Sequence, residues 1–148
     1  MWRGRQALSD GKYAQAIENF NVLTRLDTTS YWGFFFRGIA KYNLGDLRGA
    51  DTDFSTSVRL NPVFTNGYHY LGITKSRFGE YDEAYKDFRK ALELRPGLYG
   101  IYFSRGVTSF LAQKFQDAVQ DFDTYIKKEP KDPTAYLNRG ASYLFLKD

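Results

Sequence analysis

The sequence contains no cysteine and a single histidine in 148 residues. Without cysteine, the chain has no disulfide bond, no cysteine nucleophile and no thiolate ligand for a metal. His69 has no set of His, Asp or Glu residues at ligand spacing, so a metal site is not indicated. Serine and threonine residues lack a neighbouring base that would activate them as nucleophiles. We therefore expect that the chain is not an enzyme and that it binds no cofactor.

An excess of charge of one sign is also missing, as is a long apolar run. The formal net charge is +4, from 21 basic and 17 acidic residues that are mixed along the chain. Nucleic-acid-binding domains usually carry a basic stripe, which this sequence lacks. No apolar run approaches the roughly 20 residues that a membrane-spanning helix needs, and the first residues do not form a signal peptide. We expect no nucleic-acid partner and no membrane span, while the cellular compartment is not indicated.

What the sequence does have is a period. Small, aromatic and proline residues recur at a spacing of 34 without a slip of register. The glycines at this spacing are Gly4, Gly38, Gly72, Gly106 and Gly140. The same step relates three further sets, which are Ala16, Ala50, Ala84 and Ala118, then Phe20, Phe54, Phe88 and Phe122, then Pro62, Pro96 and Pro130. A fixed period of this length indicates an architecture of stacked repeats.

The unit at residues 65–98 shows why these residue types recur. It has the pattern of two amphipathic helices that are joined by a tight turn. Gly72 falls in the middle of the first helix, where glycine costs about 1 kcal/mol relative to alanine, and this cost is tolerable if it allows two helices to approach closely. Ala84 is the matching small residue on the second helix, and Phe88 fills the space around the contact. Pro96 ends the second helix because it cannot continue the helical hydrogen bonds.

This unit resembles the tetratricopeptide repeat, which carries Gly, Ala, aromatic and Pro residues at these spacings. The resemblance extends over essentially the whole chain. It implies an all-α fold, an α-solenoid of antiparallel helix pairs that form a right-handed superhelix. We expect a single array over residues 1–148, with a partial repeat at 1–30, repeats at 31–64, 65–98 and 99–132, and a partial repeat at 133–148. Since both ends fall within a repeat, we expect a fragment of a longer array, or ends that pair with another chain.

Helix boundaries follow from the apolar pattern and its punctuation. We expect helices at residues 1–9, 12–26, 31–44, 47–60, 66–78, 81–94, 99–112, 115–128 and 134–146. Asp46 and Asp132 are suitable N-caps, and Pro133 suits the first helical position. Gly11 supplies a left-handed turn residue between two helices. Gln113 stands where the other turns have glycine, so that turn is expected to be slightly strained or closed differently.

Arginine and aspartate also recur in phase. Arg37, Arg105 and Arg139 share one position of the repeat, as does Arg3. A second position, near the contact between the two helices, carries Asp53, Asp87 and Asp121. A buried Arg–Asp pair between helices would satisfy both charges with bidentate geometry, and we prefer this interpretation to a ring of arginines that binds an anion.

The resemblance also indicates where a partner would bind, because the first helices of tetratricopeptide units line a concave groove. The residues that this implies are Trp32, Phe35, Ile39, Tyr42, Asn66, His69, Ile73, Arg77, Phe103, Val107, Phe110 and Leu137. Chaperone-binding members of the family clamp a C-terminal carboxylate with Lys and Asn at two positions of the repeat. Here the first position carries Phe35, His69, Phe103 and Leu137, and the second carries Ile39, Ile73, Val107 and Ala141, so that mode is rejected. An apolar groove favours capture of a hydrophobic peptide or an amphipathic helix. The alternative, in which these side chains pack on each other in a tightly curved superhelix, is equally open.

We therefore interpret the chain as a non-catalytic scaffold for protein–protein interaction. Its partner would be a protein or peptide with an apolar or amphipathic segment. The alternative is self-association, as a dimer or a higher assembly, through the two ends and the aromatic face. For His69, we expect a simple polar contact rather than a pH sensor or a ligand contact.

Overall fold

The computed structural model describes residues 2–147, so Met1 and Asp148, the ends of the expected array, lie outside the described part. The described residues form helices and no strand, which confirms the all-α prediction. The helices are α1 (Trp2–Ser9), α2 (Tyr13–Leu26), α3 (Tyr31–Asn43), α4 (Leu47–Leu60), α5 (Thr65–Phe78), α6 (Tyr81–Leu94), α7 (Gly100–Leu111), α8 (Phe115–Ile126) and α9 (Pro133–Leu146).

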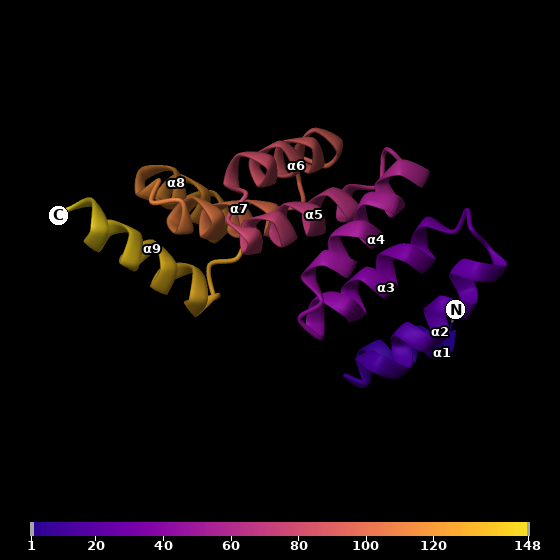
Figure 1. Ribbon diagram of the computed structural model, residues 1–148. Coiled ribbons are helices and arrows are strands. Elements are labelled where there is room, and N and C mark those ends of the chain that lie inside the picture. The colour runs from indigo at the N-terminus through magenta and orange to yellow at the C-terminus, as the bar shows by residue number, and fades with distance from the viewer. Residues whose placement is uncertain (1, 148) are drawn as a thin grey trace.

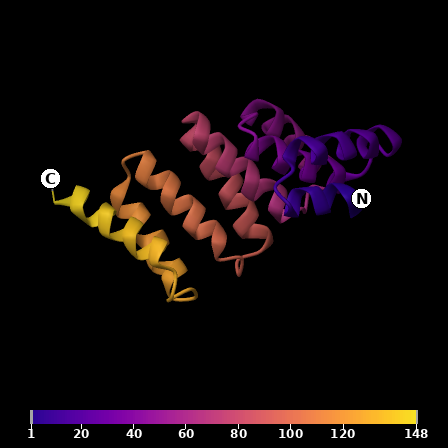
Figure 2. The ribbon, with the colours of Figure 1, turned by 90° about the horizontal axis from the view of Figure 1, so that it is seen from below.

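Consecutive helices pack as antiparallel pairs, α1 with α2, α3 with α4, α5 with α6 and α7 with α8. Each pair also packs against the next along the chain, and α9 packs on α8. Figures 1 and 2 show the result, an elongated and curved array with the two termini at opposite ends. The predicted α-solenoid of helix pairs is confirmed.

The helices divide into two layers. The odd-numbered helices contact one another from pair to pair, at α1–α3, α5–α7 and α7–α9, whereas the described even-numbered helices make no comparable contacts. Closer approach in one layer curves the stack toward that layer. The odd-numbered helices therefore form the inner layer of the array and the even-numbered helices form the outer layer.

The repeated glycine and phenylalanine form the contact inside each helix pair. Phe54 is fully buried, and a Cβ atom added to Gly38 would lie 2.7 Å from its ring. The ring of Phe88 lies equally close to Gly72, and the alanine of each repeat is fully buried beside the phenylalanine. Because a side chain on the glycine would displace the ring, the two residue types recur together and hold the helices at close distance.

The predicted helix signals are also present. The side chain of Asp46 accepts a hydrogen bond from the backbone N–H of Gly49 at 2.9 Å, and Asp132 caps α9 directly before Pro133. Gln113 has a φ angle of 61°, in the same left-handed region as the turn glycines Gly45 and Gly79. The α7–α8 turn is thus closed in the same way as the others, and the strain is carried by a residue with a Cβ atom.

Candidate functional site

A pocket of about 290 Å³ opens on the inner layer, between α3, α5 and α7. Five of the residues expected to line a groove converge on it. Tyr42 comes from α3, Ile73 and Arg77 from α5, and Phe103 and Val107 from α7. The walls are therefore largely apolar, and we call this site the inner groove.

The polar side chains of the inner groove already have partners. Arg77 is exposed and lies over the Tyr42 ring, with 5.7 Å between the guanidinium carbon and the ring centroid. It also donates a hydrogen bond to the Tyr42 hydroxyl at 3.3 Å. Deeper in the pocket, the buried Thr108 hydroxyl donates to Ser76 Oγ at 2.9 Å. The parts of the groove that remain open to a ligand are therefore its apolar side chains and, at the rim, the exposed Arg77.

The aromatic part of the expected groove is packed on itself. Phe35 is only 4% exposed and contacts Phe54, Phe64 and Tyr70 with ring centroids 4.8–5.8 Å apart. It is a core residue and does not line an open groove, which corrects its assignment from the sequence. Trp32 packs edge-on against Phe64, also at 4.8 Å. These large rings bury one another because α3 carries aromatic residues on several sides. A single apolar face of the helix could not accommodate them all.

The remaining expected residues lie outside the inner groove. His69 is largely buried, and its Nε2 lies 2.8 Å from Ser104 Oγ. Burial lowers the pKa of His69 to about 4, so the ring is neutral at pH 7. Phe110 packs edge-on against Phe115 and Phe145, with ring centroids 5.5 and 5.6 Å away. The other three are Ile39, which packs on the α3 aromatic cluster, Asn66, which is half-buried, and Leu137, which is 72% exposed on α9.

In two of the repeats, arginine and aspartate form the expected interhelical pair. Arg37 donates from Nε and Nη2 to both carboxylate oxygens of Asp53, at 2.8 and 2.6 Å. Arg105 makes the same bidentate contact with Asp121, at 2.8 and 2.7 Å. Both carboxylates are buried, and the hydrogen bonds to them raise the pKa of each arginine. These pairs are structural parts of the helix contact.

The central repeat has leucine at the arginine position, so a different cation pairs with its aspartate, Asp87. Lys75, one turn further along α5, donates to Asp87 Oδ2 at 2.6 Å. Desolvation nevertheless raises the pKa of Asp87, and this opposes the effect of its lysine partner. Sequence reasoning also missed the small polar residue Thr108 in the inner groove, although the period places it on an inner helix.

Within residues 2–147, no three His, Asp or Glu side chains gather closely enough to hold a metal ion. None of the helices in this part of the chain has both the length and the apolar character that crossing a bilayer requires.

The fold is that of an all-α solenoid of helical repeats. Residues 65–98 match the family model described as Tetratricopeptide repeat, and solved structures of similar fold include tetratricopeptide-repeat proteins. The resemblance read from the sequence is thus confirmed at residues 65–98, which match a tetratricopeptide repeat, and the rest of the chain has the same fold as solved proteins of that kind. Proteins of this family are generally scaffolds that bind other proteins without catalysing a reaction.

Three solved structures illustrate the similarity. A crystal structure of MamA is 27% identical, with a TM-score of 0.77 over 86% of this chain and 75% of that one. A MamA fragment from Desulfovibrio magneticus RS-1 has a TM-score of 0.88 at 17% identity, over 98% and 82% of the two chains. TTC0263, a thermophilic tetratricopeptide-repeat protein of Thermus thermophilus, has a TM-score of 0.83 at 20% identity, over 97% and 79%. A search of curated proteins found no match.

Proposed function

We propose that the chain is a non-catalytic scaffold that binds an apolar or amphipathic segment of a partner protein in the inner groove. The observation that carries the proposal is the convergence of Ile73, Phe103 and Val107 on one open pocket of about 290 Å³. Apolar side chains that stay accessible on a folded surface favour association, because covering them removes apolar area from water.

The form of the partner follows from the wall and the rim. The pocket is small, so it suits one or two apolar anchor side chains that project from a helix or an extended peptide. Arg77 stands at the rim and already contacts the Tyr42 ring. An acidic residue beside the anchors would meet this guanidinium without displacing the ring contact. We therefore expect an amphipathic segment with apolar anchors on one face and at least one flanking carboxylate.

Selection from a displayed library of random peptides tests the proposal without a known partner. Peptides would be selected on the wild-type protein and then measured against Val107→Glu, which places a charge in the apolar wall. We expect selected peptides to carry apolar residues at helical spacing and to lose at least tenfold in affinity, since burial of one unpaired charge costs several kcal/mol. Arg77→Glu, at an exposed position, should weaken peptides with acidic flanks.

The controls distinguish a lost site from a lost fold. Both variants should keep the helical circular dichroism signal of the wild type, and Arg59→Glu, which alters an exposed arginine on α4, should bind as the wild type does. Selected peptides that bind Val107→Glu and Arg77→Glu with unchanged affinity would contradict binding in the inner groove.

Self-association is a second candidate, which rests on a separate observation on α9. Leu137, Leu144 and Phe145 expose 72, 67 and 54% of their surface on this helix. Contiguous exposed apolar residues are a common feature of association surfaces. Light scattering over a wide concentration range tests this candidate, because the mass should rise above 17.1 kDa and Leu144→Glu should suppress the rise. A constant monomer mass would exclude it.

A further inference from the structure

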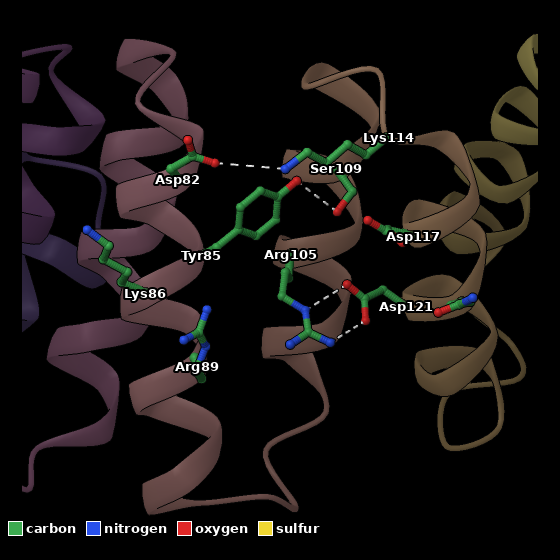
Figure 3. A pocket seen from close by; sticks show the side chains of 10 residues that line it. Asp82, Tyr85, Lys86, Arg89, Arg105, Ser109, Lys114, Asp117 and Asp121 are labelled. Atoms are coloured by element: carbon green, nitrogen blue, oxygen red, sulfur yellow. Dashed lines mark hydrogen bonds and ion pairs between the residues drawn. The ribbon is translucent and has the colours of Figure 1, made fainter.

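A second pocket lies on the outer layer, away from the inner groove. It has a volume of about 500 Å³ and is formed by α6, α7 and α8. Figure 3 shows its charged lining, with Arg89 on α6, Arg105 on α7 and Asp121 on α8. We call it the outer pocket. Four cationic and three acidic side chains line it, so its lining carries one excess positive charge.

Arg105 in this pocket differs from its counterparts in the other repeats. Arg37 uses Nη1, the nitrogen that does not face Asp53, to donate to Asn21 Oδ1 and Thr24 Oγ1, each at 2.9 Å. In the last repeat, Arg139 Nη1 donates to Asp123 Oδ1 at 2.6 Å. Asn21 and Asp123 occupy the same position of the repeat, three periods of 34 apart. The preceding outer helix thus supplies an acceptor for the arginine in both cases.

At the outer pocket, this acceptor is replaced by a cation. The residue one period before Asp123 is Arg89, and the equivalent of Thr24 two periods on is Leu92. Neither side chain can accept a hydrogen bond. Arg105 still donates from Nε and Nη2 to Asp121, but its Nη1 has no partner among residues 2–147. Arg89 likewise makes no ion pair or side-chain hydrogen bond with the described residues, and Figure 3 shows its guanidinium level with that of Arg105.

The other cations at this site are already engaged. Lys114 lies 3.8 Å from Asp82 and 4.6 Å from the centre of the Tyr85 ring. Lys86 forms an ion pair with Glu83 at 2.7 Å. The guanidinium donors that have no acceptor among the described residues are therefore those of Arg89, which is exposed, and Nη1 of Arg105.

We propose that the outer pocket binds a single carboxylate, from an acidic side chain of a peptide, between Arg89 and Arg105. The ligand supplies the acceptor that the outer helix supplies in the other repeats. Guanidinium groups suit this role because their planar donors match a carboxylate in bidentate geometry. A carboxylate adds a single negative charge beside the acidic residues of the lining, whereas a phosphate dianion would add two. This site is independent of the inner groove, which uses other helix faces.

A titration followed by NMR tests the proposal on the whole chain. The probe is a tripeptide with blocked ends and a central glutamate, and its glutamine analogue is the matched control. We expect the glutamate peptide to give saturable shifts of the Arg105 Nε–Hε signal and of amides in α6, α7 and α8. Arg89→Asn, which introduces the amide that Asn21 provides to Arg37, should reduce this affinity about tenfold or more. Arg59→Asn, on the exposed face of α4, should leave it unchanged.

Each other outcome counts against the proposal. It would be overturned by the absence of saturable shifts, by equal shifts with the glutamine analogue, or by unchanged binding in Arg89→Asn. Tighter binding of inorganic phosphate than of the glutamate peptide would overturn the assignment to a carboxylate. The variant should melt at or above the wild-type temperature, because its new amide gives Arg105 an acceptor. Should it melt lower, Arg89→Lys gives the comparison instead, since it keeps the charge without the planar donors and should bind more weakly.

Discussion

Replacing the same glycine in two different repeats should have opposite effects on stability. A Cβ atom on Gly72 would lie 2.6–2.9 Å from three ring carbons of Phe88, which is fully buried and cannot yield. Overpacking of this kind costs about 1–3 kcal/mol, whereas alanine gains up to about 1 kcal/mol over glycine in a helix. Gly72→Ala should therefore destabilise the chain by up to about 2 kcal/mol.

Gly140→Ala is the matched control. Gly140 occupies the same position of the repeat on α9, but no atom lies within 4 Å of the Cβ that it would gain. Only the gain in helix propensity remains, so this variant should be more stable by up to about 1 kcal/mol. Urea unfolding followed by circular dichroism measures both variants. Equal effects of the two substitutions would refute the reasoning, because the difference between them isolates the contact with Phe88.

Two further predictions concern buried polar groups. Arg105→Leu leaves the buried Asp121 without its partner. It should lower the free energy of unfolding, measured in urea, by roughly 1–3 kcal/mol. A loss no larger than that of Arg139→Leu, whose partner is more exposed, would contradict this. Burial lowers the pKa of His69 to about 4 in the folded chain. As the pH falls below about 6.5, His69 is therefore protonated in the unfolded chain while it stays neutral in the folded one. Stability should thus fall by about 2 kcal/mol between pH 7.5 and 5, and His69→Gln should lose less over this interval; equal losses would contradict the assignment.

The repeat and its core could be predicted from the sequence because they depend on residues that touch within one unit. Gly38 and Phe54 recur in phase, and their contact is the same in each pair. The pairing of Arg37 with Asp53 follows from the same phase. Even the unusual turn at Gln113 was visible, because the other repeats have glycine there.

The division of the inner layer into core and groove could not be predicted in the same way. Phe35 and Phe103 occupy the same position of the repeat, yet Phe35 is buried among aromatic rings while Phe103 lines the inner groove. The difference comes from Phe64 and Tyr70, which cover Phe35 from the next pair. Contacts of this kind depend on how neighbouring repeats pack, which the phase of a single repeat does not define.

The outer pocket could be predicted from the sequence only in part. The sequence shows that Arg89 stands at the repeat position that Asn21 and Asp123 occupy elsewhere. The structure adds that Asn21 and Asp123 accept hydrogen bonds from arginines, which Arg89 cannot do. A change of charge within a repeat thus becomes informative once the role of its counterparts is known.

Mapping where a selected peptide binds tests the central claim most directly. Backbone amide shifts of the isotopically labelled chain would be recorded as an amphipathic peptide from the library is added. If the inner groove is the binding site, the largest shifts will fall on α5 and α7, around Ile73 and Val107, with smaller ones near Tyr42. Shifts confined to the outer helices α4, α6 and α8 would contradict binding in the inner groove.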